Sequence, residues 1–164
     1  MSNESGAVSV PSMVSIQPAG REDAAAILSL QRLAYLSEAK LYDDDSIPPL
    51  VQTLEELSAE FASKLFLKAV EDGALVGSVR GHAREGVAFL ERLAVDPACQ
   101  GRGVGTLLVR SFEASFPGAQ RFELFTGHKS ERNIALYRRL GYVPFRRERI
   151  HPGLEIVYLE KRVG

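Results

Sequence analysis

The spacing of apolar residues divides the chain into segments with the period of a helix and segments with the period of a strand. Helical periodicity, with apolar residues three or four positions apart, begins after Asp23, near Pro49, at Val104 and at Glu131. Alternating or continuously apolar runs predict strands at 13–17, 64–71, 74–84, 88–95, 121–126, 142–150 and 154–161. This mixture and order of elements predicts an α/β fold.

Three local expectations concern the first two helices. Asp23 stands where its carboxylate can cap the first helix. The second helix is expected to run unbroken from about Pro49 to Phe61, because its apolar residues follow steps of four, three and four. The segment 40–48 between them holds three consecutive aspartates and a proline, which favour a loop.

The strand at 88–95 determines which side chains share a face of the sheet. Strict alternation places one set of side chains on each face. The two sets are Phe89, Glu91, Leu93 and Val95, and Leu90, Arg92 and Ala94. Glu91 and Leu93 are therefore expected to point the same way.

Composition narrows the class of protein. With 164 residues, of which 45% are hydrophobic, the chain can fill one core, so a single domain is expected at 12–164. The segment 1–11 is small, polar and unpatterned, which predicts a disordered tail. Twenty basic and 21 acidic residues give a net charge of −1, so neither nucleic acid nor an anionic membrane is an expected partner.

Cysteine and histidine usage bears on compartment and metal binding. The single cysteine, Cys99, excludes an intrachain disulfide and fits a reducing compartment. No apolar run approaches the ~20 residues of a membrane span, and no secretory leader is apparent, so the cytoplasm is expected. The three histidines share no metal-ligand spacing with Cys99, and no metal is expected.

The segment 96–106, between a predicted strand and a predicted helix, reads DPACQGRGVGT. Its glycines let the backbone approach a ligand, and the helix start offers free N–H groups, which together suit a pyrophosphate. A glycine-rich connection without a ligand is the alternative. A nucleotide loop is disfavoured, because Thr106 breaks the dinucleotide fingerprint and no P-loop lysine follows.

The segment matches a different pattern, Arg/Gln-x-x-Gly-x-Gly/Ala, at Gln100, Gly103 and Gly105. A second motif at 133–142, NIALYRRLGY, has an asparagine and then a tyrosine just before Leu-Gly-Tyr. In both motifs the sequence resembles the GNAT superfamily of N-acetyltransferases, most strongly over 90–145.

The resemblance implies a mixed, mostly antiparallel sheet of six or seven strands with about four flanking helices, and acetyl-CoA as cosubstrate. It places the pyrophosphate on the glycine segment and the pantetheine arm beside the strand at 88–95, whose edge can pair with its amides. The implied cofactor-binding residues are Leu93, Ala94, Val95, Gln100, Gly101, Arg102, Gly103, Val104, Gly105, Thr106, Asn133 and Tyr137.

Acetyl transfer to an amine also needs a proton donor for the thiolate and a base for the amine. Tyr137, one helical turn after Asn133, is the expected donor, and a packed aromatic ring is the alternative. Glu91 is the candidate base. In the alternative, Glu91 pairs with an arginine or faces solvent, and ordered water acts as the base.

These observations predict direct transfer of acetyl to a primary amine of a small molecule, a protein N-terminus or a lysine, in a ternary complex. The alternative is a non-catalytic acetyl-CoA sensor or interaction module. The acceptor is expected against the first two helices and the last hairpin. The strand at 154–161 is expected at an edge of the sheet, where two copies would pair as a homodimer.

Overall fold

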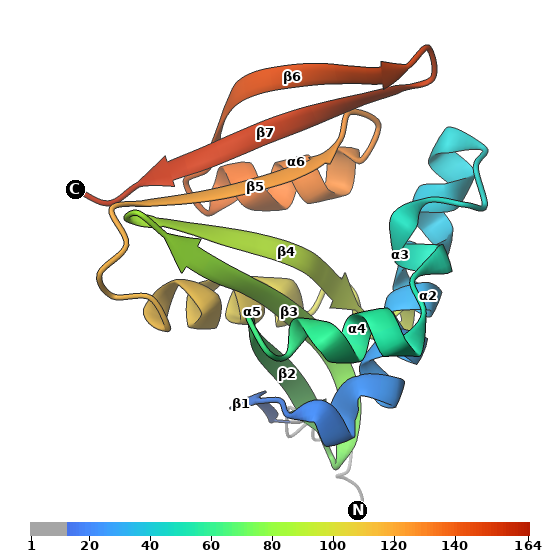
Figure 1. Ribbon diagram of the computed structural model, residues 1–164, viewed down its shortest axis with the longest axis vertical. Coiled ribbons are helices and arrows are strands. Elements are labelled where there is room, and N and C mark those ends of the chain that lie inside the picture. The colour runs from blue at the N-terminus through green and yellow to red at the C-terminus, as the bar shows by residue number, and fades with distance from the viewer. Residues whose placement is uncertain (1–12) are drawn as a thin grey trace, which may run out of the picture.

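The computed structural model describes residues 13–164, which form a seven-stranded sheet with helices on both faces (Figure 1). The strands are β1 (Val14–Pro18), β2 (Leu65–Glu71), β3 (Ala74–Arg84), β4 (Val87–Val95), β5 (Arg121–Gly127), β6 (Val143–His151) and β7 (Leu154–Arg162). Their order is β1-β2-β3-β4-β5-β7-β6, and the β4–β5 pair is parallel while the other neighbours are antiparallel. The expected α/β fold with a mixed sheet is confirmed, and the expected tail at 1–11 lies outside the described residues.

Five α-helices and two 3-10 turns complete the described part of the chain. They are η1 (Arg21–Asp23), α2 (Ala24–Tyr42), α3 (Pro48–Val51), α4 (Leu54–Glu60), η2 (Pro97–Cys99), α5 (Val104–Ala114) and α6 (Glu131–Arg139). Helices α5 and α6 contribute to the larger core cluster on one face, and α2 and α4 pack around Phe66 on the other. The helix starts that follow β4 and β5 therefore lie on the same side of the sheet.

Two glycines of β3 let α5 lie close to the sheet. A Cβ atom on Gly77 would stand 2.8 Å from Leu108 Cδ1, and one on Gly81 would stand 2.6 Å from Phe112 Cζ. Leu108 and Phe112 are fully buried. This tight contact fixes where the N-terminus of α5 lies relative to the end of β4.

The first two helices differ from the sequence prediction in three ways. Asp23 does not cap α2 with its side chain, because that carboxylate accepts a hydrogen bond from the Gly20 N–H and pairs with Lys68 at 3.0 Å. Helix α2 also continues to Tyr42, three residues into the predicted loop. The expected second helix is two helices, α3 and α4, because Thr53 and Glu56 form a capping box that starts a new one.

The expectation that Glu91 and Leu93 share a face of the sheet is wrong. The pairs Ser78–Ala94 and Arg80–Glu91 leave one extra residue on β4, a bulge at which Arg92 has a φ of +52°. Leu93 packs against the core cluster under α5, whereas Glu91 lies on the opposite face and accepts a hydrogen bond from Lys64. The bulge therefore separates Glu91 from the side chains at the end of the strand.

The position of the last strand also corrects a prediction. Strand β7 pairs with β5 on one side and with β6 on the other, so it is not at the edge of the sheet. The edge strand at this end is β6, and nearly all of its residues are exposed. A homodimer formed through the edge strand would use β6, and the homodimer itself stays a prediction.

A buried arginine joins β3 to the helices on its face. Arg80 is 2% exposed and donates hydrogen bonds to Glu60 at 2.8 and 3.1 Å, to Gln31 at 2.9 Å and to Gln52 at 2.9 Å. Burial alone would raise the pKa of Glu60, but the hydrogen bonds from Arg80 and Lys64 outweigh it and lower this pKa to about 2. Helices α2 and α4 are therefore fixed to the sheet through one guanidinium group.

We expect Arg80→Met to lower the free energy of unfolding by about 3 kcal/mol, because it leaves the Glu60 carboxylate without its main partner. Paired Glu60 stabilises the folded state above its unfolded pKa of 4.5, and this contribution is lost as the pH falls toward 2. Urea titrations between pH 7 and pH 2.5 should show a weaker pH dependence in Arg80→Met. The exposed Arg110→Met is the control, and an equal loss in both variants would contradict the prediction.

Candidate active site

Strands β4 and β5 are paired only near their N-terminal ends. Val87, Ala88 and Phe89 pair with β5, and no residue from Leu90 onward does. Figure 1 shows the two strands diverging toward the side on which α2 lies. The facing edges of the two strands are thus left open beyond this short ladder, which gives a long ligand room to pair with backbone groups.

A cleft of about 1410 Å³ lies at this divergence, between α2, the end of β4, the glycine segment, the start of α5 and the N-terminal part of α6. Nine of the predicted binding residues line it: Leu93, Val95, Gln100, Gly101, Gly103, Val104, Gly105, Thr106 and Asn133. Ala94 is buried, and Arg102, Tyr137 and Glu91 are not on the cleft wall. The cleft brings together the two motifs that are about 30 residues apart in the sequence.

The glycine segment forms an open cradle at the start of α5. Asp96 holds the preceding η2 turn by accepting a hydrogen bond from the Ala98 N–H at 2.9 Å. Gly101 and Gly103 have φ values of +79° and +87°, and a Cβ atom on either would meet nothing within 4 Å. Gly103 is the N-cap of α5, so the first free N–H groups of the helix adjoin this space. These features suit the binding of a phosphate group.

The cations near the cradle differ from those expected. Arg102 pairs with Glu71, 3.2 Å between Nη1 and Oε1, and this hydrogen bond raises the pKa of Arg102. Arg132 and Arg139 of α6 line the cleft instead, and Arg132 donates a hydrogen bond to Gln100. Sequence reasoning missed Arg132, although its position just before Asn133 in the second motif was a usable signal.

Tyr137 lies behind the cleft wall. It is 5% exposed, and its ring centroid is 6.0 Å from that of Tyr142. Burial, with smaller contributions from Tyr35 and Glu38, raises the pKa of Tyr137 above its ordinary value of 10. The phenol therefore stays protonated at neutral pH.

Two polar residues of α2 on the cleft wall were not anticipated from the sequence. The Tyr35 hydroxyl donates a hydrogen bond to the Leu93 carbonyl oxygen at 3.1 Å, and burial raises the pKa of Tyr35 to about 12. Glu38 accepts a hydrogen bond from the hydroxyl of Ser130, which also contacts the Tyr42 hydroxyl at 3.1 Å. The spacing of Tyr35, Glu38 and Tyr42, which favours one helix face, was the available signal.

Glu91, the predicted base, is held in an ion pair on the α2 face of the sheet. Its Oε1 lies 2.5 Å from Lys64 Nζ, and its Oε2 lies 3.9 Å from Nδ1 of His82. Glu91 does not pair with an arginine, as one alternative predicted, because its partner is a lysine. His82 itself stacks on Phe89, with 5.2 Å between the ring centroids.

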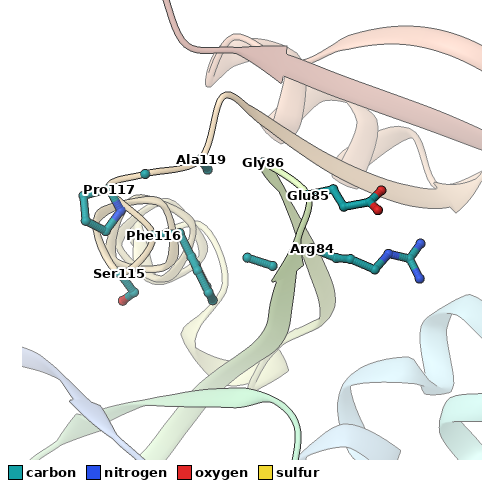
Figure 2. Close-up of a pocket in the computed structure, with 9 residues that line it drawn as sticks. Arg84, Glu85, Gly86, Ser115, Phe116, Pro117 and Ala119 are labelled. Atoms are coloured by element: carbon teal, nitrogen blue, oxygen red, sulfur yellow. The ribbon is translucent and has the colours of Figure 1, made fainter.

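A second, smaller hollow of about 330 Å³ lies between the β3–β4 turn and the loop after α5. Figure 2 shows Phe116 and Pro117 on one side of it, while Arg84 and Glu85 extend away from α5. Small residues and backbone make up most of the remaining wall. The larger cleft holds residues of both motifs and is therefore the candidate site.

Residues 13–164 contain no group of three histidine, cysteine, aspartate or glutamate side chains arranged to hold a metal ion. None of their helices combines the length and apolar character required to span a membrane.

Solved structures with the same fold include several acetyltransferases. The PaiA N-acetyltransferase from Thermoplasma acidophilum, in complex with coenzyme A, is 20% identical, with a TM-score of 0.78 over 92% of this chain and 99% of that one. The ribosomal-protein-S18-alanine N-acetyltransferase from Escherichia coli is 18% identical, with a TM-score of 0.78 over 93% and 95%. YncA from Salmonella typhimurium, with its cofactor acetyl-CoA, is 17% identical, with a TM-score of 0.73 over 93% of this chain and 95% of that one.

No curated protein matches the chain significantly. The model of the acetyltransferase (GNAT) family matches residues 26–142, which include the glycine cradle, most of the cleft wall and Tyr137. The match covers well over half of the sequence and agrees with the resemblance seen in its two motifs. The chain belongs to the acetyltransferase (GNAT) family.

Proposed function

We propose that the protein is an acetyl-CoA-dependent N-acetyltransferase that transfers acetyl directly to a primary amine in a ternary complex. The observation that carries this proposal is the cleft between the diverged strands, which runs to an open glycine cradle at the start of α5. Coenzyme A is long and has an anionic pyrophosphate at one end of its pantetheine arm, so its shape and charge fit these two features. The complexes of PaiA and YncA with coenzyme A and acetyl-CoA support the choice of cosubstrate.

Different residues of the cleft would bind different parts of coenzyme A. Backbone N–H groups from Gln100 to Thr106 would hold the pyrophosphate, and Arg132 and Arg139 would contribute positive charge beside it. The open edge of β4 near Leu93 and Val95 would pair with the pantetheine amides, and Asn133 would contact the arm from α6. Ala94 would contribute through its backbone, because its side chain is buried.

The proposed reaction needs one proton removed before attack and one delivered to the sulfur. The acceptor loses a proton from its ammonium group, and its nitrogen then bonds to the acetyl carbon. The bond from that carbon to sulfur breaks as Tyr137 donates a proton to the departing sulfur, and the second proton lost by the nitrogen restores the Tyr137 phenol. The products are the N-acetyl amine and CoA thiol, with one net proton released.

Tyr137 stays the proposed proton donor, because its phenol is neutral at pH 7 and can donate a hydrogen bond. Glu91 stays the proposed base, with ordered water in its place as the alternative, although the bulge turns its carboxylate to the face opposite Leu93. A backbone N–H near Val95 would polarise the acetyl oxygen. The acceptor is a small amine, a protein N-terminus or a lysine; the relative from Escherichia coli acts on an alanine of ribosomal protein S18, according to its name.

Release of free thiol from acetyl-CoA, measured across a panel of amines, tests the proposed function. We expect thiol release that depends on the amine and saturates with acetyl-CoA. Binding of acetyl-CoA without thiol release for any amine would instead identify a sensor or interaction module.

Gly103→Val should weaken CoA binding by about tenfold or more in calorimetry, because the side chain would occupy the phosphate space and shield the helix N–H groups. Its backbone strain, on the order of 1–2 kcal/mol, needs a control. Gly73→Val supplies one, since Gly73 has a φ of +80° in an open hairpin turn and does not line the cleft. Equal CoA affinity in both variants would remove the cradle from the proposal.

Tyr137→Phe should lower kcat by about a hundredfold while CoA affinity changes little, because the variant loses a proton donor but keeps the ring. Stopped-flow detection of thiol and calorimetry of CoA give the two quantities. Tyr142→Phe is the control, since its equally buried hydroxyl donates to Glu113 at 2.8 Å. An unchanged kcat in Tyr137→Phe would exclude Tyr137 as the proton donor.

Glu91→Gln should lower kcat/KM and abolish the decline of activity at low pH, if the carboxylate of Glu91 is the base. The substitution also breaks the ion pair with Lys64, so the Lys64→Met variant is the control. Lys64→Met breaks the same pair and should keep the acidic limb of the pH profile. An unchanged acidic limb in Glu91→Gln would favour ordered water as the base.

A further inference from the structure

Helix α2 places one carboxylate on the wall of the cleft. Glu38 lines the cleft and accepts a hydrogen bond from the Ser130 hydroxyl at Oε1. Its other oxygen, Oε2, accepts no hydrogen bond from residues 13–164, and no cation among them pairs with the carboxylate. The residue is partly exposed. One carboxylate oxygen is therefore open to a ligand in the cleft.

A chain of hydrogen bonds holds Glu38 in place. The Tyr42 hydroxyl accepts a hydrogen bond from the Lys129 N–H at 2.9 Å and lies 3.1 Å from the Ser130 hydroxyl oxygen. Ser130 has one hydroxyl proton and directs it to Glu38, so Tyr42 is the donor to Ser130. The chain thus runs from the Lys129 N–H through the two hydroxyl groups to the carboxylate. Because all of these donors are neutral, none of them compensates the negative charge of Glu38.

Two local features allow this chain of hydrogen bonds to form. Ser130 is the N-cap of α6 and is 2% exposed, yet its side chain makes no capping hydrogen bond. A serine at this position usually stabilises the helix start by accepting a hydrogen bond from a backbone N–H. A Cβ atom on Gly127 would overlap the Tyr42 hydroxyl, so the glycine makes room for it. The helix start lacks a cap while Glu38 has a donor, which favours a functional role for this carboxylate.

The contacts of α2 relate Glu38 to the proposed reaction. Tyr35, one helical turn before Glu38, donates a hydrogen bond to the Leu93 carbonyl oxygen near the end of β4 at 3.1 Å. Ser130 follows β5, so α2 contacts the chain beside both of the strands that diverge. The glycine cradle adjoins α5, on the opposite face of the sheet from α2. A coenzyme A molecule with its pyrophosphate in the cradle and its arm in the gap would bring its thioester toward α2 and Glu38.

Glu131 is the other carboxylate that lines the cleft, and its surroundings differ. It is exposed, and its side chain makes no hydrogen bond or ion pair within the described part of the chain. The next residue, Arg132, donates a hydrogen bond to Gln100 of the glycine segment. Glu131 thus adjoins the cradle side of the cleft, and Glu38 is the carboxylate on the α2 side.

We propose that Glu38 binds the ammonium group of the acceptor and that Ser130 and Tyr42 are positioning residues, which hold its carboxylate in place. An ammonium group donates three hydrogen bonds, and Oε2 of Glu38 can accept one of them while Oε1 stays with Ser130. Ala34 and Leu41 line the cleft four residues before and three residues after Glu38 on α2, so they suit an aliphatic chain next to the nitrogen. This inference rests on the proposed acetyltransferase function, specifies how its acceptor is bound, and is independent of which group acts as the base.

The test compares an aliphatic amine with the alcohol of the same chain length, which keeps the carbon chain but lacks the positive charge. The probes are n-butylamine, an ammonium ion at pH 7, and 1-butanol. With the CoA-loaded protein, calorimetry should show at least about tenfold tighter binding of the amine than of the alcohol. Thiol release from acetyl-CoA gives the KM for the amine as a second measurement.

Glu38→Gln keeps an oxygen that accepts from Ser130 but removes the charge. It should abolish the preference for the amine and raise the KM for the amine, while CoA affinity stays unchanged. Ser130→Ala should weaken amine binding in the unmodified background and have no further effect in the Glu38→Gln background, because it acts through Glu38. Glu131→Gln removes the other carboxylate of the cleft wall, so it is the matched control and should keep the preference.

Three results would overturn the assignment: no preference for the amine in the unmodified protein, a preference that survives in Glu38→Gln, or an equal loss in Glu131→Gln. An additive effect of Ser130→Ala in the double variant would refute its positioning role. Amine-dependent thiol release with an unchanged KM in Glu38→Gln would refute this site and leave the proposed function intact. A preference for the amine in calorimetry that depends on Glu38, without thiol release for any amine, would support the site and refute the function.

Discussion

The arrangement of the site depends on where the backbone pairing between β4 and β5 ends. The two parallel strands are joined only at Val87–Phe89, and beyond that point each keeps a partner on its far side, β3 for β4 and β7 for β5. The sheet therefore stays continuous while a cleft opens within it. The glycine cradle, the end of β4 and α6 all face this one gap.

The two faces of the sheet position different helices beside the gap. On one face, close packing of α5 on Gly77 and Gly81 fixes the helix start that borders the cradle. On the other face, Arg80 holds α2 and α4 to β3 through charged hydrogen bonds. Because α2 is fixed in this way, Tyr35 and Glu38 extend from it to the cleft wall. The position of the α2 wall of the cleft thus depends on a buried network that does not line the cleft.

Much of the fold and of the cofactor side could be predicted from the sequence. Apolar periodicity located every strand, and two short motifs identified nine cleft residues, because glycine at positive φ and a helix start leave a local signature. The β4 bulge could not be predicted, since an extra residue in a ladder does not alter the apolar pattern. The break at Thr53 was visible as a capping box.

The α2 wall of the cleft was harder to predict for a physical reason. Tyr35 and Glu38 reach the cleft only because α2 crosses the end of a strand that comes nearly 60 residues later. The partner of Arg102, Glu71, is likewise distant in sequence, so no spacing rule could indicate that Arg102 turns away from the cradle. Contacts of this kind depend on how the elements pack, which a single sequence does not specify.

The exposed edge strand has a consequence for the behaviour of the protein in solution. Strand β6 presents three arginines and one glutamate in nine residues, Arg146, Arg147, Arg149 and Glu148. A second copy approaching edge to edge would bring two strands of net positive charge together, and their mutual repulsion opposes open-ended stacking of sheets. The arginines of β6 thus oppose edge-to-edge association at this end of the sheet, where no further strand pairs.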